Sequence, residues 1–375
     1  MVHSQRQALP LLLLSLASIW IVTGCAEIPR HSGATGIDSH PPTNWNPKAM
    51  SEKMKKILEY GARAPNSHNA QMWAIQIITD DEIAILFNSE RALPAVDPKN
   101  RESMISIGAF IENIVEAAGA YGLTSTVSVV AHEATDKKIA TIRFTASQDE
   151  PSKLAFDDIA ERHTIRTPFL TRELSSLDLA TIRSIDNEIA YFPYGTPQGQ
   201  YLKAAIVQSM QEQVENEAQE AEFAAWVRLN DKEAQQSHDG LTWKKAMGLS
   251  GIKKWFASTF ISRRALMSKS FRSQTVETVK GQASSCAGFI VVSSQDNSVE
   301  SLINAGRTLE KLWLVATHLK IAVHPMSSPL EESPWNNEIA GRLGVGPEVQ
   351  MLLRVGYVKN YGGPDSLRIE VPIME

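Results

Sequence analysis

Two polar segments of the sequence carry side chains suited to binding a charged ligand. In residues 161–169 the side chains of Arg162, Thr164 and Arg166 alternate along the chain. In an extended or turn segment such side chains point the same way, so two guanidinium groups and a hydroxyl would converge. Guanidinium groups form paired, charge-assisted hydrogen bonds with phosphate oxygens, so this spacing favours a phosphate site. The alternative is an ordinary surface loop with solvated arginines.

The other polar segment, residues 64–71, separates a predicted helix from a predicted strand. Its residues Asn66, Ser67 and Asn69 offer amide and hydroxyl groups that could hydrogen-bond a ligand at the end of a sheet. The alternative is an Asn/Ser turn that caps its neighbours. His68 and His324 could each be catalytic or a structural hydrogen-bonding residue. Both polar segments therefore need a scaffold that brings them to one place.

Apolar periodicity predicts the elements of that scaffold. Helical spacing marks two strongly patterned core helices, residues 107–121 and 302–319, and a shorter helix, residues 50–60. Strand patterns fall at residues 73–79, 82–87, 126–130, 139–144 and 350–358. A mixture of helices and strands in this order predicts an α+β fold.

The two core helices match at a fixed offset, which suggests two copies of one unit. Gly108 aligns with Gly306 and Glu112 with Glu310. The same offset pairs Ala118 with Ala316 and Leu123 with Ile321. The halves predicted from this match are residues 50–155 and 156–375.

A charged, mostly helical segment, residues 200–280, interrupts the second half. It is acidic at residues 211–222 and basic at residues 244–272. It could be a solvated helical insertion, a lid over a ligand site, or a basic face that lies on anionic lipid.

Composition argues against several classes of protein. The chain has 375 residues, 43% of them hydrophobic, and a formal net charge of -5, which argues against a nucleic-acid partner. It has two cysteines, too few for a disulfide framework, and its nine histidines are scattered, so we expect no metal site. Cys286 lies beside a predicted buried strand and is expected to be an inert core thiol.

The first residues read as an export signal rather than as part of the fold. Arg6 precedes an apolar run, residues 9–22, that ends in Val-Thr-Gly-Cys at Cys25. This ending resembles the lipidation signal of bacterial lipoproteins, with residues 1–24 as signal peptide and residues 25–49 as a flexible tether. Lipidation of Cys25 would place the protein in the cell envelope, on the periplasmic side of a bacterial membrane. An uncleaved anchor or a plain secretory signal are the alternatives.

Taken together, the motifs resemble those of the nitroreductase family. Residues 162–166 are similar to its Arg-x-Ser/Thr-x-Arg/Lys phosphate motif, and residues 65–73 to its Pro-Ser-x-x-Asn-x-Gln-Pro-Trp loop. Asn66 stands at a usual Ser position, and Met72 replaces the second proline. Residues 226–248, with Asp239-Gly240-Leu241, resemble the Acg-like branch, whose members carry two nitroreductase-like halves in one chain. The resemblance implies two fused halves that form an internal pseudo-dimer, in a chain that acts as a monomer.

The order of the motifs departs from the family pattern. Ordinary members place the phosphate motif first, and their dimers build each FMN site from the phosphate motif of one subunit and the Pro-Ser loop of the other. Here the loop lies in the first half and the phosphate motif opens the second. A fused pair of this kind would keep one complete FMN site.

The resemblance also implies which residues bind FMN. Arg162 and Arg166 would hold the phosphate or the pyrimidine edge, and the amide of Met326 or Ser327 would donate to flavin N5. The full implied set is Asn66, Ser67, Asn69, Arg162, His163, Thr164, Arg166, Pro325, Met326, Ser327 and Arg368.

Because FMN itself carries the redox chemistry, no catalytic side chain is implied. The implied function is an FMN-dependent oxidoreductase that reduces nitroaromatics, quinones or similar flat acceptors, with NAD(P)H as a possible donor. The alternative is a non-catalytic lipoprotein that stores FMN beneath a lid. A third possibility is a lipoprotein that docks a membrane or partner through basic residues 253–272.

Overall fold

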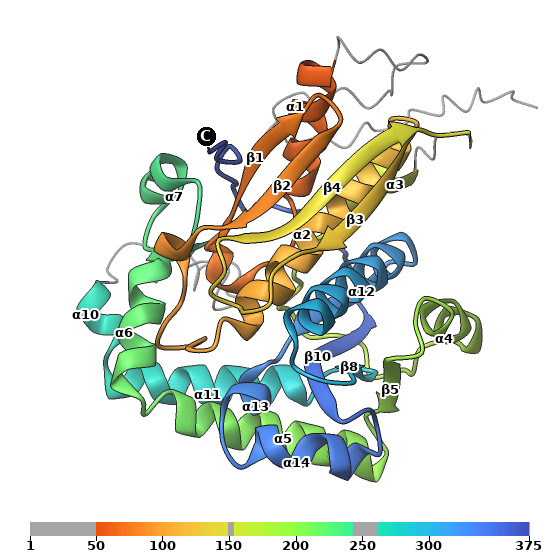
Figure 1. The fold of residues 1–375 in the computed structure, drawn as a ribbon. Helices are drawn as coiled ribbons and strands as arrows, with labels where there is room; N and C mark the ends of the chain where they lie inside the picture. The colour runs from red at the N-terminus through yellow and green to blue at the C-terminus, as the bar shows by residue number, and fades with distance from the viewer. Residues whose placement is uncertain (1–49, 149–153, 243–261, 375) are drawn as a thin grey trace, which may run out of the picture. The chain divides into compact units, whose positions relative to one another are not determined.

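The described part of the chain is built around two four-stranded sheets, each with one long helix. The structure is a computed structural model that describes residues 50–148, 154–242 and 262–374 (Figure 1). These residues all belong to one unit, Ile37–Glu375. The predicted signal peptide, the tether, Cys25 and residues 253–261 of the basic stretch 253–272 lie outside the described residues.

The first sheet follows helix α1 (Met50–Gly61) and has the strand order β1-β2-β4-β3, with all neighbours antiparallel. One face carries Ile75, Ile83 and Ile85 against the core, while Ala74, Ala84 and Leu86 lie on the other. The elements are β1 (Trp73–Thr79), β2 (Glu82–Phe87), helix α2 (Arg101–Ala120), β3 (Leu123–Val129) and β4 (Lys138–Ala146). Two short 3-10 turns, Ser67–Asn69 and Ser89–Arg91, flank β1 and β2.

The second sheet has the order β5-β8-β10-β9, also antiparallel throughout. Its strand β8 is buried along its whole length because the sheet is covered on both faces. The elements are β5 (Ile189–Pro193), β8 (Gly288–Ser294), helix α12 (Val299–His318), β9 (Ile321–Pro325) and β10 (Glu348–Tyr357). Helices α3 (Leu154–Glu161) and α4 (Ser176–Arg183) precede it, and α13 (Ser328–Glu331) and α14 (Trp335–Leu343) lie between β9 and β10.

Helices α2 and α12 cross at two glycines. A Cβ on Gly108 would lie 2.2 Å from the Ile303 carbonyl oxygen, and one on Gly306 would lie 2.0 Å from that of Ile105. Helices α2 and α12 each have 20 residues. The residue pairs matched in the sequence, such as Gly108 and Gly306, are all 198 positions apart. Only glycine allows two backbones to approach this closely.

Residues 194–287, which we call the intervening segment, connect β5 to β8. As the sequence predicted for residues 200–280, their described part is mostly helical, with two short parallel strands. The elements are α5 (Pro197–Gln213), α6 (Glu217–Trp226), β6 (Val227–Arg228), α7 (Asp231–Ser237), β7 (Leu241–Thr242), α10 (Arg263–Leu266) and α11 (Lys269–Ala283).

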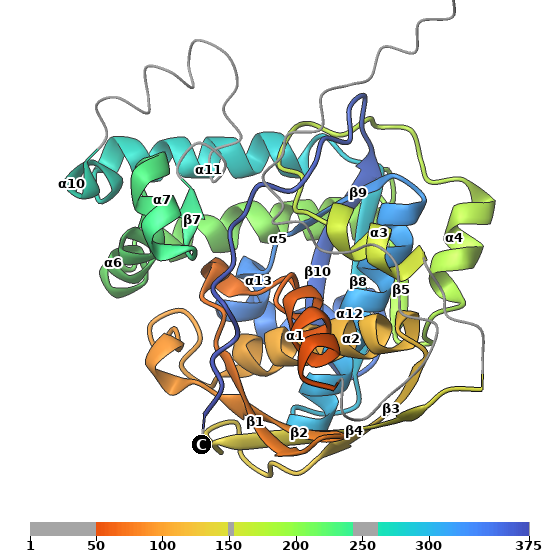
Figure 2. The same ribbon diagram turned by 90° about the horizontal axis from the view of Figure 1, so that it is seen from above.

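After β10 the chain returns to the first sheet. Residues 358–374, here called the tail, run from the second sheet to the edge of β1 (Figure 2). The Ile75 amide donates to the Pro372 carbonyl at 2.9 Å, and the Met374 amide donates to the Ile75 carbonyl at 2.8 Å. The tail was predicted as part of the second half, yet it completes the edge of the first sheet.

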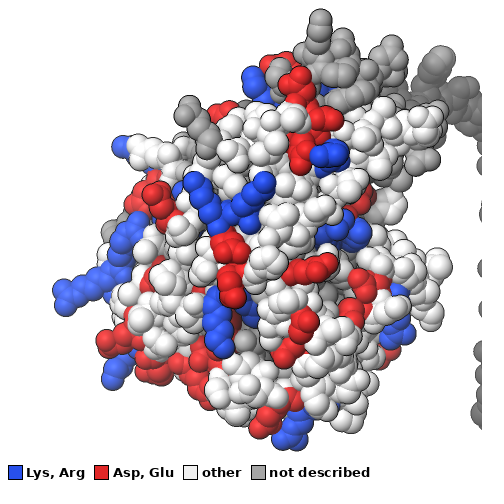
Figure 3. All heavy atoms as spheres, viewed as in Figure 1, with Lys and Arg blue, Asp and Glu red and all other residues white. Residues whose placement is uncertain are grey.

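Among the described helices, none is long and apolar enough to cross a bilayer. On the face of the molecule drawn in Figure 3, acidic and basic side chains are interspersed.

Candidate functional site

Arg162 follows the end of α3 and is almost completely buried. Its Nε lies 3.1 Å from Oε1 of Glu310, a fully buried carboxylate on α12. Its Nη2 donates to the Arg63 carbonyl, and the guanidinium stands over the Trp313 ring at 5.0 Å. The first residue of the phosphate motif is therefore fixed between the second core helix and the end of α1.

Arg368, on the tail, reaches the same place. Its Nε donates to the Ala62 carbonyl at 2.7 Å, and its Nη2 donates to the carbonyls of Arg63 and Ala64, both at 3.3 Å. Burial, with the nearby charges of Arg162 and Arg63, lowers the pKa of Arg368 to about 9. We call Arg63, Arg162 and Arg368 the arginine cluster.

Glu310 is the buried carboxylate that faces this cluster. Burial raises the pKa of Glu310 to about 7, although Arg162 opposes the shift. The guanidinium groups of Arg162 and Arg368 thus both act on one carboxylate that is itself only partly ionised at neutral pH, and Arg63, which has Glu59 nearby, adds a third positive charge. Such an excess of positive charge at a partly dry site suits a doubly charged anion such as a phosphate monoester.

Arg166 lies in different surroundings from Arg162. It is close to His324 of β9 and Arg354 of β10, which sit opposite each other in the sheet. Burial lowers the pKa of Arg166 to about 10, and burial with the charges of Arg354 and Arg166 holds the pKa of His324 well below its usual value. His324 is therefore neutral, with a buried Nδ1 that has no partner among the described residues.

Arg354, in β10, bonds the backbone of the phosphate motif and so helps to hold it in place. Its Nη2 donates to the carbonyls of Ile165 and Thr167, at 3.3 and 3.2 Å. It is fully buried, and burial lowers its pKa to about 9. Next to Arg162, a ring nitrogen of His163 lies 2.9 Å from the Tyr361 carbonyl, while Thr164 is half-buried. The guanidinium groups of Arg162 and Arg166 thus do not converge on one point. Arg162 lies at Glu310, whereas Arg166 lies near His324 and Arg354.

The loop of residues 64–71 uses its polar groups to fix its own shape. The Asn66 side chain donates to the Ala64 carbonyl at 3.1 Å and accepts from the Gln71 amide at 2.8 Å. His68, Asn69 and Gln71 have φ values of 53°, 53° and 56°, in the left-handed region that side chains disfavour. Loops with several such residues keep their shape only when surrounding contacts hold them.

Ser67 binds one of two neighbouring carboxyl groups. Its hydroxyl donates to Glu102, near the start of α2, and Glu102 shares a hydrogen bond with Glu331 of α13. Ser327, which precedes α13, hydrogen-bonds to Glu331 in turn. Burial and the charge of Glu102 raise the pKa of Glu331 well above its usual value. The pKa of Glu102 is lowered: burial opposes the shift, but Arg101 and hydrogen bonds outweigh it. Of the two carboxyl groups, Glu331 is therefore the one that keeps its proton to higher pH.

Residues 325–327 differ in whether their backbone amides could donate to a flavin. The Met326 amide donates to the Leu352 carbonyl at 2.9 Å, because residue 326 continues the pairing of β9 with β10. Because the Met326 amide already has a backbone partner, Ser327 is the better candidate for the predicted bond to flavin N5. Pro325 ends β9 beside it.

The comparisons with known proteins agree with the motifs. Acg of Mycobacterium tuberculosis, which carries the name of an NAD(P)H nitroreductase, is 30% identical over 121 residues, 32% of this chain and 36% of Acg. PigM of Serratia, with the same kind of name, is 22% identical over 294 residues, 74% of this chain and 80% of PigM. Rv3131 of M. tuberculosis is 21% identical over 310 residues, 82% of this chain and 86% of that protein.

The chain is similar to NAD(P)H nitroreductases.

The match to Acg covers about a third of the length of Acg. The matches to PigM and Rv3131 cover most of this chain and most of each relative. No protein-family model matches the chain. Two solved nitroreductase structures align with a TM-score of 0.35 each. They are NfnB from Mycobacterium smegmatis in complex with NADPH (13% identity, 55% of this chain, 88% of NfnB) and a nitroreductase from Anabaena variabilis (9% identity, 85% and 90%).

Several residues that shape this candidate site were not found from the sequence. Glu310 was noted only as a match to Glu112, and Arg63 as the residue before the loop. Arg354 had a usable signal, since an arginine inside an apolar strand must find partners when it is buried. Glu102 and Glu331 had none, because their proximity depends on how α2 and α13 pack.

A metal centre has no support among the described residues, which contain no group of three or more His, Cys, Asp or Glu placed to hold an ion. Cys286 is fully buried, and burial raises the pKa of its thiol to about 11, so it is not a thiolate at neutral pH.

Proposed function

We propose that this chain is a nitroreductase-like flavoprotein that holds one FMN between two fused halves. The observation that carries the proposal is the arginine cluster with its single buried carboxylate. Arg162 from the second half and Arg368 from the tail both bind carbonyl groups at the end of α1, where the Pro-Ser-like loop begins. An FMN phosphate there would meet three guanidinium groups, which is the donor set that a phosphate prefers.

The internal pseudo-dimer is supported by the topology of the two sheets. Each has two strands, a long helix and two more strands, paired in the order first, second, fourth, third. The crossing of α2 and α12 is reciprocal, with Gly108 against Ile303 and Gly306 against Ile105. This reciprocity is what a two-fold axis through the crossing would produce.

A single site per chain is supported by the residues around the two matched glutamates. Glu112, like Glu310, is fully buried, but it is neutralised by Arg307 at 2.7 Å and Lys311 at 3.3 Å, both from α12. The positions equivalent to these cations are the uncharged Ala109 and Asn113, so the positive charge facing Glu310 comes from the arginine cluster, while Asn113 adds a hydrogen bond. The equivalent region around Glu112 is therefore already filled by internal ion pairs.

Bound FMN would supply electron transfer between a nicotinamide donor and a flat acceptor such as a nitroaromatic or a quinone. The donor class follows from the names of the relatives. In this proposal the arginine cluster holds the phosphate, and Asn66, Ser67 and Asn69 shape the wall of the site from the first half. Ser327 offers its amide, Arg166 and neutral His324 offer polar groups, and hydrogen bonds through Glu102 and Glu331 link Ser67 to Ser327.

The proposed location is the cell envelope, with the chain anchored by lipid on Cys25. The support is the sequence of the first residues, Val-Thr-Gly-Cys after an apolar run. Labelling cells with a radioactive fatty acid should mark the wild-type protein and leave a Cys25→Ala variant unlabelled. Unlabelled wild-type protein would contradict the anchor.

The purified protein without its predicted signal peptide and tether, residues 50–375, provides the test of function. After saturation with FMN and gel filtration, we expect one FMN per chain from the absorbance spectrum, whereas none or two would contradict the proposal. Anaerobic NADPH should then bleach the flavin, and a nitroaromatic or quinone should restore its colour. If only dithionite bleaches it, the chain stores FMN without catalysing its reduction by a nicotinamide.

A further inference from the structure

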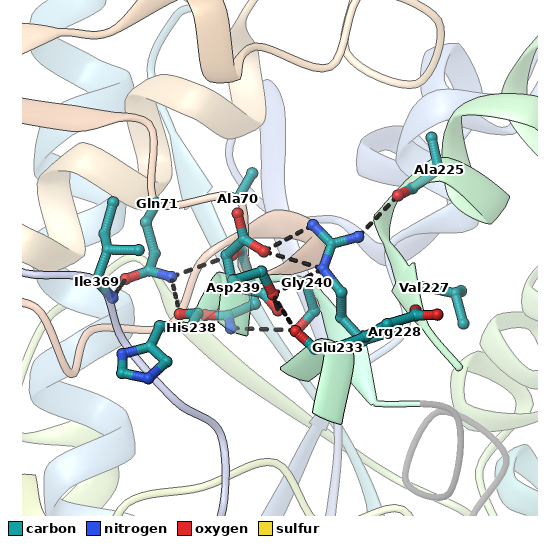
Figure 4. A network of polar contacts seen from close by, with 12 residues as sticks. Ala70, Gln71, Ala225, Val227, Arg228, Glu233, His238, Asp239, Gly240 and Ile369 are labelled. Carbon is teal, nitrogen blue, oxygen red and sulfur yellow. Dashed lines mark hydrogen bonds and ion pairs between the residues drawn. The ribbon is translucent and has the colours of Figure 1, made fainter. Parts of the chain in front are cut away.

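The intervening segment contacts both of the segments to which we assign FMN binding. Its residues 238–240 bind the loop of residues 64–71, and Gln282 at its other end binds the phosphate motif. Figure 4 shows the first of these contacts, with Asp239 lying between Arg228 and the loop residues Ala70 and Gln71. A segment that only covered a bound ligand would not need hydrogen bonds to both binding segments.

At the loop, two side chains donate to backbone carbonyls of the intervening segment, and one backbone amide of that segment donates to the loop backbone. The Gln71 side chain donates to the His238 carbonyl at 3.0 Å, and the Asn69 side chain donates to the Gly240 carbonyl at 3.1 Å. The Gly240 amide donates back to the Asn69 carbonyl at 3.2 Å. Asn69 and Gln71 are two of the three residues in the left-handed region, so these bonds act on the strained part of the loop.

Asp239 fixes the position of residues 238–240. Its carboxylate pairs with Arg228 at 2.6 Å and with Arg91, whose Nε also donates to the Ala70 carbonyl. Both guanidinium groups stand over the ring of Trp226, at 5.6 and 5.4 Å. Burial opposes ionisation, but hydrogen bonds from Arg228 and Arg91 hold the pKa of Asp239 below its usual value. Asp239 is therefore a charged link between the intervening segment and the first half.

At the phosphate motif, Gln282 makes the corresponding link between the intervening segment and a binding segment. Its side chain donates to the Arg166 carbonyl at 3.0 Å, and its own carbonyl accepts from Arg354 at 2.8 Å. Arg354 in turn binds the carbonyls of Ile165 and Thr167. Gln282 is buried near the C-terminus of α11, so the end of this helix and the phosphate motif are fixed together.

We propose that Asp239 and Gln282 are positioning residues through which the intervening segment holds both FMN-binding segments in their binding geometry. Asp239 acts on the loop of the first half, and Gln282 acts on the phosphate motif of the second. The inference rests on the proposed FMN site, but the contacts themselves exist without FMN and can be tested without it.

The first experiment uses hydrogen exchange on flavin-free protein. Asp239→Asn should raise the exchange of residues 64–71 by about tenfold and leave residues 162–169 unchanged, while Gln282→Ala should do the reverse. Glu233→Gln is the matched control. Its carboxylate binds Leu229, Asn230 and Arg263, all within the intervening segment, so both regions should exchange as in wild type. Equal exchange in wild type and both variants would overturn the proposal.

The second experiment measures FMN dissociation by dilution into a flavin-trapping apoprotein. Both positioning variants should release FMN about tenfold faster than wild type and Glu233→Gln, and Asp239→Glu should restore at least part of the slower rate. Rates within twofold of wild type would contradict the inference. A wild type that binds no flavin would instead defeat the proposed function, and the exchange experiment would still decide the positioning.

If Asp239→Asn does not fold, Arg91→Lys provides the same comparison. Lysine keeps the charge that Asp239 faces but cannot bond the Ala70 carbonyl and Asp239 together through a planar fork. Faster exchange of residues 64–71 in this variant supports the proposal, and unchanged exchange overturns it.

Discussion

Glu112 and Glu310 occupy matched positions on α2 and α12, and neither side chain is exposed, yet they are neutralised from different sources. Glu112 pairs with Arg307 and Lys311 of the opposite helix. Glu310 pairs with Arg162, which belongs to the phosphate motif. In the proposed pseudo-dimer, this difference would leave one FMN site per chain. Two cations of α12 pair with Glu112, whereas the equivalent positions on α2 hold the uncharged Ala109 and Asn113, and Asn113 hydrogen-bonds to Glu310.

The largest effect is expected from Arg162→Ala. The change leaves Glu310 buried without its ion-pair partner, which should lower the free energy of unfolding by about 3–5 kcal/mol. It should also abolish FMN binding, because the arginine cluster loses its central member. Urea denaturation and a flavin titration measure the two effects.

The matched change around Glu112 is Arg307→Ala. Arg307 is partly exposed and Lys311 remains, so we expect a loss of no more than about 1 kcal/mol and unaltered FMN affinity. Equal losses of stability in the two variants would remove the distinction between the two regions.

The helix crossing is tested by Gly306→Ala. The new Cβ would meet the Ile105 carbonyl oxygen, so α2 and α12 must move apart, at a cost of about 1–3 kcal/mol. Gly119→Ala, in the same pair of helices, meets nothing within 4 Å and should stabilise by up to about 1 kcal/mol. Thermal unfolding of both variants measures the contrast, and a neutral Gly306→Ala would show that the crossing is not close-packed.

The charge of Glu310 is tested by the pH dependence of stability. Its pKa is raised from 4.5 to about 7 on folding, so the folded state holds this proton more tightly than the unfolded state does. The resulting stability is complete below pH 4.5 and is lost as the pH rises to about 7. In Glu310→Gln the free energy of unfolding should fall less over this range, by on the order of 2 kcal/mol. Identical slopes in urea denaturation would argue against a raised pKa.

The smallest effect concerns the turn after each core helix. Gly122 follows α2 with φ 73°, and the matched residue after α12 is Lys320, with φ 55°. Lys320→Gly relieves this strain but removes an exposed ion pair with Glu161, so we expect a gain of up to about 1 kcal/mol. Gly122→Ala should cost a similar amount. A destabilised Lys320→Gly in thermal unfolding would show that the two turns are not equivalent.

The fold was predicted well where apolar spacing reports burial. The strands Trp73–Thr79 and Glu82–Phe87 were placed correctly, since their residues alternate between core and outer face. Helix α2 begins at Arg101 rather than at residue 107, because its first turns bury polar groups such as Ser103, which binds Asp97. Apolar periodicity cannot detect a buried serine whose partner lies outside the helix.

The candidate site was predicted less completely, because motifs identify binding segments but not the contacts that orient them. Arg162 and the loop residues were proposed as binding residues from their types and spacing, and their binding role stays a prediction. The divergence of Arg166 toward His324 and Arg354 depends on the register of β9 with β10, which the sequence does not state. The same register occupies the Met326 amide.

The path of the tail has a consequence for biosynthesis. Arg368 follows β10 in the sequence, and the residues beyond it pair with Ile75 in the first strand. A nascent chain therefore cannot assemble all three guanidinium groups until both sheets have been translated. FMN would then be captured by a chain whose two halves have already met, and not by the first half as it leaves the ribosome.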